Sequence, residues 1–199
     1  MKNLIYLGHP GIVAVLAFFM QLLTIKSPEF GISGIKLFYS WIGFAAWGSY
    51  FLAGCTFKGG LKVVGCWAAG IISSICIIYI GTILQGIIHP VVAWSIAVGF
   101  IAFFMILFEN VSVVDMIPAW FIGAGCFFGL NSMISSLSAS SALSADDGSN
   151  MYRVAVAVII SCIVGQIFGH VTIYLRTGYG NIFEKDSRLN EGNIEAQTT

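Results

Sequence analysis

Residues 61–80 read LKVVGCWAAGIISSICIIYI and carry a single charge, Lys62, near one end of an otherwise apolar stretch. A helix needs roughly 20 apolar residues to cross the hydrocarbon core of a bilayer. Five more stretches of this kind lie on either side, and the one quoted can run on to residue 88. They are residues 4–25, 37–55, 91–108, 118–134 and 154–175. The sequence therefore predicts an all-α membrane protein with six transmembrane helices.

The composition supports lipid as the solvent of this chain. Of its 199 residues, 58% are hydrophobic and 9% are charged, whereas soluble domains carry about 25% charged residues. So apolar a chain cannot bury all its apolar side chains, and its surface in water would be apolar too. The net charge is zero and no basic stripe accompanies the aromatic residues, which argues against nucleic-acid binding. Membrane lipid is the expected partner.

The reactive residue types are scattered. The five cysteines stand singly inside apolar runs and form no Cys-x-x-Cys pair, which is typical of small packing residues rather than ligands or disulfides. His9, His89 and His170 lie on three different predicted helices, with no His-x-x-x-His spacing. We therefore expect no catalytic residues, no metal site and no cofactor, and we do not expect an enzyme.

The domain organisation follows from these spans. Residues 1–176 are predicted to form a single six-helix transmembrane domain with halves at about 1–88 and 89–176, followed by a polar, disordered cytoplasmic tail over 177–199. Lys58-Gly59-Gly60 is expected to form the hairpin turn between the second and third spans. Residues 138–150 are the long internal loop.

The basic residues set the expected orientation, because loops on the cytoplasmic side are enriched in Lys and Arg. With both termini inside, six basic residues are cytoplasmic and three are outside. The inner set is Lys2, Lys58, Lys62, Arg176, Lys185 and Arg188; the outer set is Lys26, Lys36 and Arg153. This count favours a cytoplasmic location for both termini without excluding the reverse.

An internal repeat is suggested by two similar segments. His9-Pro10 and His89-Pro90 each open an apolar stretch, and an Ala-Phe-Phe follows in both, at residues 17–19 and 102–104. Later, residues 44–46 resemble 122–124, and 60–63 resemble 151–154. Either short apolar segments recur by chance, or the chain contains two inverted repeats of three helices each. Inverted repeats are common in transporters.

The repeat suggests a role for its two histidines. A helix that begins at Pro10 or Pro90 directs its positive dipole end toward the preceding His9 or His89, which favours a neutral ring. Inverted symmetry places these rings at opposite faces, as two ends of one path. The alternative is that each is an interfacial residue that ends a helix.

Neutral polar residues at membrane depth are the other candidates for a substrate pathway. No Asp, Glu, Lys or Arg lies in the middle of a predicted span, and ion pumps and proton-driven transporters usually carry such charges. Gln166 and His170 are four residues apart and share one helix face, beside the close-packing pair Gly165 and Gly169. They form part of a polar path or an interhelical hydrogen bond.

Further candidates lie on two other spans. Asn131 follows a glycine-rich run in the fifth span, where either close packing or a pore lining is expected. Trp41, Trp47 and Tyr50 in the second span can line a narrow aromatic passage, although aromatic residues are also ordinary in span contacts.

Three motifs carry a family resemblance. Residues 40–44 (SWIGF), 58–62 (KGGLK) and 117–124 (IPAWFIGA) resemble the YcdZ-like family of small bacterial inner-membrane proteins, defined by a domain of unknown function. The resemblance covers about residues 38–175. It implies a multi-pass protein of the bacterial inner membrane and contributes no substrate and no catalytic residue. The His-Pro element, the long loop and the tail depart from the family.

Together these patterns favour a channel or facilitated transporter for a small, mostly neutral solute. A homo-oligomer is also expected, with the small-residue faces 125–129 and 165–169 as contacts. The alternative function is a structural or accessory membrane subunit that binds another membrane protein. It predicts dry, fully packed contacts around Gln166 and His170.

Overall fold

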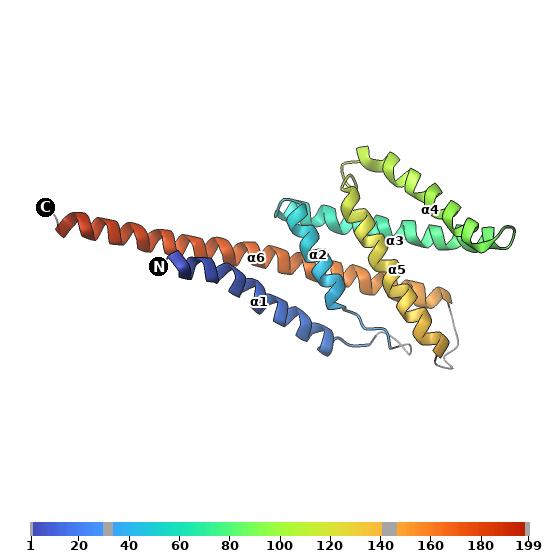
Figure 1. The fold of residues 1–199 in the computed structure, drawn as a ribbon, viewed down its shortest axis with the longest axis horizontal. Helices are drawn as coiled ribbons and strands as arrows, with labels where there is room; N and C mark the ends of the chain where they lie inside the picture. The colour runs from blue at the N-terminus through green and yellow to red at the C-terminus, as the bar shows by residue number, and fades with distance from the viewer. Residues whose placement is uncertain (1, 30–33, 141–146, 198–199) are drawn as a thin grey trace.

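The computed structural model describes the backbone of residues 2–29, 34–140 and 147–197, and the side chains of residues 8–29, 34–136 and 150–180. Within these ranges the chain forms six α-helices and one short 3-10 turn (Figure 1). They are α1 (Lys2–Lys26), α2 (Ser40–Leu52), α3 (Phe57–Gln85), α4 (Pro90–Leu107), η1 (Phe108–Asn110), α5 (Ile117–Ser140) and α6 (Asp147–Gln197). The described part contains no β-strand beyond an isolated bridge between Glu29 and Lys36, so the all-α prediction is confirmed.

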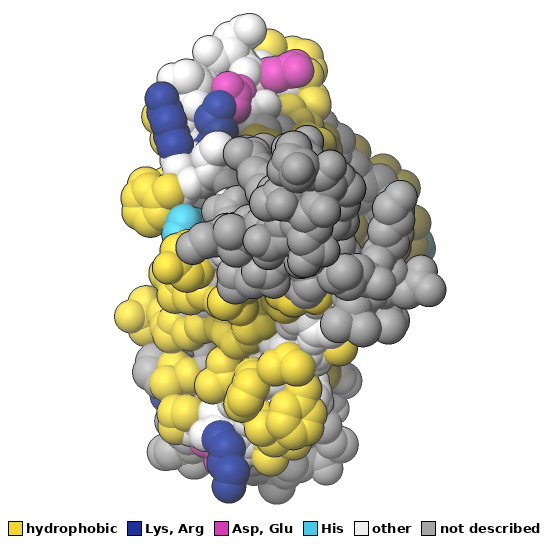
Figure 2. Space-filling view, turned by 90° about the vertical axis from the view of Figure 1, so that its left-hand side faces the viewer, with side chains coloured by type: hydrophobic (Ala, Val, Ile, Leu, Met, Phe, Trp, Pro, Cys, Tyr) yellow, Lys and Arg dark blue, Asp and Glu magenta, His cyan; other side chains and the backbone are white. Residues whose placement is uncertain are grey.

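Five of these helices are long and apolar enough to cross a membrane: α1, α3, α4, α5 and α6. Large apolar side chains remain exposed along them, among them Ile72, Val91 and Phe103 at 62%, 69% and 63%. Soluble monomers rarely expose contiguous apolar surface of this kind. The end-on view in Figure 2 shows apolar side chains gathered on its left and lower parts, with Lys and Arg at the upper left and at the bottom. The helices therefore suit contact with membrane lipid.

The second expected span, residues 37–55, differs from the structure. α2 has 13 residues, which at 1.5 Å per residue is about 20 Å, short of the roughly 30 Å hydrocarbon core. It begins late because Tyr39 is extended, with φ −125° and ψ 120°. It ends early because Gly54 and Cys55 both have positive φ. Six continuous spanning helices are therefore not confirmed.

Hydroxyl groups hold the extended entry to α2. The backbone N–H groups of Phe38, Tyr39 and Ser40 donate to the hydroxyl oxygens of Ser27, Ser161 and Thr24 at 2.9, 3.0 and 2.7 Å. These amides lie just before the helix or at its first residue, and they lack intrahelical partners. Side chains from α6, from α1 and from Ser27, the residue after α1, thus satisfy a stretch of backbone that packs inside the molecule.

The turn between α2 and α3 lies earlier than expected. Residues 53–56 make the turn, and the Thr56 hydroxyl accepts a hydrogen bond from Gly59 N at 3.0 Å as the N-cap of α3. The Lys58-Gly59-Gly60 segment therefore belongs to the first turn of α3. Thr at an N-cap is a common helix start.

Packing pairs the helices across the two halves of the chain. α2 packs mainly on α6 and α5 mainly on α3, while α1 also packs on α6 and α4 on α3. α3 and α6 run antiparallel through the centre (Figure 1). The main core lies among α2, α3, α5 and α6 and includes Trp67, Phe127 and Leu130. Cys66, Cys126 and Cys162 are buried in it, consistent with their predicted role as packing residues.

The helix termini separate the two His-Pro elements. His89 is the N-cap of α4 and Pro90 its first residue, as the sequence predicts. Pro10, in contrast, lies inside α1, so His9 does not sit at a helix start and the expected dipole argument does not apply to it. At the other end, α6 continues as helix to Gln197. No break in secondary structure marks the expected boundary at residue 176, and the separate tail stays a prediction.

Candidate functional site

The site is built on Gln166, which lies in the middle of the apolar part of α6. Its side chain is 8% exposed, and its Nε2 donates to the Ala46 carbonyl oxygen of α2 at 2.7 Å. α2 can approach so closely because α6 has glycines on either side of Gln166. A Cβ at Gly165 would lie 2.5 Å from Gly43 O, and one at Gly169 would lie 2.6 Å from the Tyr50 ring.

Tyr50 and His170 form a second polar contact between the same helices. The Tyr50 hydroxyl and His170 Nδ1 are 3.1 Å apart, and the two rings meet edge to face. A tyrosine hydroxyl can donate to a neutral imidazole nitrogen that carries no proton. Phe57, at the start of α3, makes a further edge contact with His170. His170 is thus held between α2 and α3.

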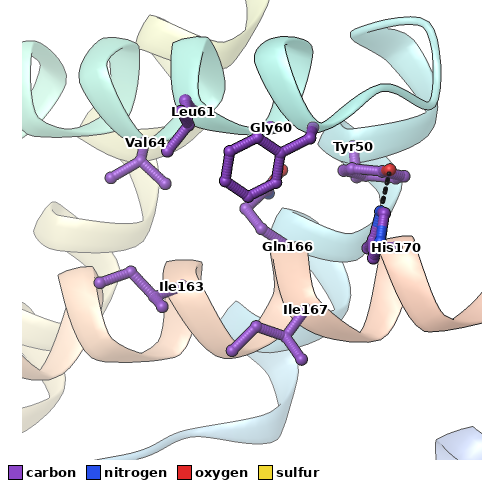
Figure 3. A pocket seen from close by; sticks show the side chains of 9 residues that line it. Tyr50, Gly60, Leu61, Val64, Ile163, Gln166, Ile167 and His170 are labelled. Atoms are coloured by element: carbon purple, nitrogen blue, oxygen red, sulfur yellow. Dashed lines mark hydrogen bonds between the residues drawn. The ribbon is translucent and has the colours of Figure 1, made fainter.

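A pocket of about 330 Å³ lies beside these residues, between α2, α3 and α6 (Figure 3). Its polar members are Tyr50, Gln166 and His170, and the rest of its wall is apolar apart from Gly60. The complete lining is Tyr50, Phe57, Gly60, Leu61, Val64, Ile163, Gln166, Ile167 and His170. Binding sites for small molecules typically combine an apolar wall with a few placed polar groups, and this pocket has that construction.

One polar atom of the pocket is unpartnered. A carbonyl oxygen can accept from the amide nitrogen but not pair with the amide oxygen, so the contact with Ala46 O identifies Nε2. The other terminal atom of the Gln166 amide is therefore the acceptor Oε1. Oε1 is buried and has no hydrogen-bond partner among the described residues. Gly60 lies opposite, since a Cβ there would come within 3.3 Å of Oε1. Leaving such an acceptor unpaired costs about 1–3 kcal/mol, so a donor that reaches it is stabilised.

The family comparison covers most of the chain. A family model described as a protein of unknown function (DUF1097) matches residues 10–176. The chain belongs to this family. Among curated proteins and solved structures, none matches the chain. The match to DUF1097 contains the whole pocket and every predicted pathway residue except His9, which lies just before it. The finer assignment to YcdZ-like proteins of bacteria stays a prediction.

The other predicted pathway residues of this DUF1097 chain lie away from the pocket. Trp47 is buried against Met20 and Phe38, and Trp41 is 44% exposed, near Gly129 of α5. The structure therefore does not bring the three aromatic residues of α2 into one passage.

Asn131, His9 and His89 also stand apart from one another. Asn131 is half-buried on α5, His9 is half-buried on α1, and His89 is exposed before α4. None of them lines the pocket. Of the eight residues predicted for the pathway, the structure brings together Tyr50, Gln166 and His170. The roles of all eight stay predictions.

Sequence reasoning missed the α3 side of the pocket. Phe57, Gly60 and Leu61 were expected in or beside a turn, whereas they occupy the first turns of α3 and face α6. Thr56, a favoured N-cap residue just before the apolar stretch, is the sequence signal that could have placed this helix start.

A salt bridge outside the pocket was also unexpected. Lys62 Nζ lies 2.6 Å from an Asp115 carboxylate oxygen, and both side chains are 35% exposed. It joins α3 to the connection before α5. Among the described side chains, no group of three or more His, Cys, Asp or Glu residues is placed to hold a metal ion.

Proposed function

We propose that this protein is a multi-pass membrane channel or facilitated transporter for a small, mostly neutral solute that binds in the pocket between α2, α3 and α6. The unpartnered Gln166 Oε1 carries this proposal, because a buried acceptor on a residue that lines a cavity is stabilised by a solute that reaches it and donates to it. No charged side chain lines the pocket, so an ion would lose its hydration without compensation. An inner-membrane location and a homo-oligomeric state belong to the same proposal.

We also propose that the two halves are inverted copies of one three-helix unit. The packing pairs support this, because exchanging α1 with α4, α2 with α5 and α3 with α6 converts each major contact into another one. When Figure 1 is rotated by 180° within the page, α3 runs in the direction of α6, and α2 runs in the direction of α5. Inverted units commonly frame a solute site in transporters.

Residue contacts support the same exchange. Gly70 of α3 lies against Trp120 O and Ala124 N of α5, while Gly165 of α6 lies against Gly43 O and Trp47 N of α2. In both pairs, the first contact is with a carbonyl oxygen and the second with the amide nitrogen four residues later. A shared packing geometry of this kind is expected of structural repeats.

A second pair of positions follows the same register. Tyr39 N donates to the Ser161 hydroxyl, and in the other half Met116 packs against the cluster that contains Cys66. The shift from Tyr39 to Met116 equals that from Gly43 to Trp120. The shift from Cys66 to Ser161 equals that from Gly70 to Gly165. One register thus relates both pairs of positions.

Six crossings remain part of the proposal, with α2 and the extended residues before it as the short crossing. Backbone polar groups inside a membrane must be satisfied within the protein. The hydroxyls of Ser27, Thr24 and Ser161 satisfy the amides before α2, which supports a membrane-embedded position for a segment that is not a continuous helix.

Flux into proteoliposomes tests the proposed function. We expect at least one of water, urea, short amides, ammonia or a weak acid to enter faster than in empty liposomes. Gln166→Leu should abolish this rate and His170→Phe should lower it, because both line the pocket. Gln85→Leu, which removes an exposed amide at the end of α3, is the matched control and should retain it.

Absence of flux for every solute, with folded protein in the membrane, contradicts transport. The accessory-subunit function then takes its place, and co-purification with another membrane protein becomes the relevant measurement. Gly125 of α5 is exposed with open space above it and remains free for such a contact. The Gly165–Gly169 face is not, because α2 already occupies it.

A further inference from the structure

We infer that the pocket between α2, α3 and α6 binds a neutral amphiphile: a solute with an apolar body and one hydrogen-bond donor, such as a hydroxyl, directed at Gln166 Oε1. This inference rests on the proposed solute pocket and names the class of solute that it takes. It favours solutes with an apolar part over solutes that are polar on all sides, such as urea.

The donor requirement follows from how the Gln166 amide is held. One N–H of its Nε2 donates to the Ala46 carbonyl, which fixes the orientation of the amide and therefore the position of Oε1. Tyr50 and His170 are hydrogen-bonded to each other. The acceptor without any partner among the described residues is the buried Gln166 Oε1, so it gains most from a donor on the solute.

The apolar body follows from the wall opposite and beside this acceptor. Leu61 and Val64 of α3 face Ile163 and Ile167 of α6 across the cavity (Figure 3). A solute that is polar on every side would lose hydrogen bonds to water along this wall and gain one at Oε1. A hydrocarbon body gains from the same contact.

The volume limits the size of that body. A cavity of about 150 Å³ lined by apolar side chains accommodates benzene, and this pocket measures about 330 Å³. Scaled by volume, it has room for about a dozen non-hydrogen atoms. A cyclic or branched alcohol of seven or eight carbons is of suitable size.

A pair of isomers isolates the donor. Cyclohexylmethanol and methoxycyclohexane share one formula, and only the alcohol carries an O–H. Their binding to the full chain in lipid nanodiscs is measured by calorimetry, with partition into empty nanodiscs subtracted. For the wild type we expect the alcohol to bind about 10-fold more tightly than the ether, which corresponds to about 1.4 kcal/mol.

Two variants locate the effect. Gln166→Met keeps the length of the side chain and removes the acceptor, so the preference for the alcohol should fall to about 1-fold. Gly60→Ala places a methyl group 3.3 Å from Oε1 and should weaken alcohol binding at least 5-fold if the acceptor is the anchor. Gly65→Ala is the matched control on the same helix, because its Cβ meets Val113 O at an ordinary 3.5 Å; it should retain wild-type binding.

Three results overturn the inference: equal affinity for the two isomers, no saturable binding of either above the lipid background, or an unchanged preference in Gln166→Met. Equal affinity would identify the occupant as a hydrocarbon chain, such as a lipid tail. The proposed transport fails separately. Tighter binding of the alcohol than of the ether, without flux of any solute, supports the amphiphile site and contradicts transport. Flux of a small solute, with equal binding of the two isomers, supports transport and contradicts the amphiphile site.

Discussion

At the scale of single residues, the site depends on glycines as much as on its polar side chains. Gly165 and Gly169 let α2 approach α6 until Ala46 O can accept from Gln166. Gly60 lies against Gln166 Oε1, where a Cβ would come within 3.3 Å of the oxygen. Small residues at helix contacts are the usual means of close approach in membranes. The polar chemistry of Gln166 thus exists because three neighbouring glycines make room for it.

Gly165→Ala is expected to destabilise the fold by about 1–3 kcal/mol, because its Cβ would lie 2.5 Å from the backbone oxygen of Gly43, which cannot move aside without shifting α2. Unfolding of the detergent-solubilised protein, followed by circular dichroism, measures the change. Gly125→Ala, where nothing lies within 4 Å, is the control and should stay within about 0.5 kcal/mol of wild type. Equal stability of the two variants would contradict the close contact.

At the scale of elements, the start of α3 positions one wall of the pocket. The Thr56 hydroxyl caps the helix by accepting from Gly59 N, and the next turn presents Gly60 and Leu61 to α6. α2, shorter than the other helices, ends at Leu52 because positive φ angles at Gly54 and Cys55 reverse the chain. The pocket thus lies next to a tight turn.

Thr56→Ala should cost about 0.5–2 kcal/mol of stability through loss of the cap, and Thr56→Ser should recover most of it because serine retains the accepting oxygen. The same unfolding measurement reports both. Alanine and serine variants of equal stability would show that the cap contributes nothing. Ligand binding should weaken in the alanine variant, since fraying of the first turn displaces Gly60.

At the scale of the whole molecule, the proposed twofold exchange relates the two halves but does not make them identical. By the shift that relates Gly70 to Gly165, Gln166 corresponds to Ile71, which is buried in the main core. One half therefore presents an amide where the other presents hydrocarbon. The proposed repeat thus supplies the frame, and divergence within it supplies a single polar site.

The proposed six crossings place both termini on the same side of the membrane, and cytoplasmic by the distribution of Lys and Arg. Reporter fusions at each terminus, one active only in the cytoplasm and one only outside, should both report the cytoplasm. Termini on opposite sides would mean an odd number of crossings, and α2 would then not cross.

The sequence by itself determined that the chain is helical and suited to a membrane, because apolar stretches such as residues 61–80 and 91–108 are long enough to cross and little charge interrupts them. It also indicated that Gln166 and His170 share a helix face, which follows from the helical period. That period could have separated Trp41 from Tyr50 as well, since nine residues place them on opposite faces of α2.

Only the tertiary structure decided which helices meet around Gln166. Partner choice depends on contacts between residues far apart in the chain, such as Ala46 with Gln166 and Gly60 with Oε1, and no local pattern encodes them. The length of α2 was decided in the same way. Residues 37–55 are apolar enough for a full span, but hydroxyls from α1 and α6 stabilise extended backbone before it. Long-range hydrogen bonds thereby replaced the turn of helix that composition alone predicted.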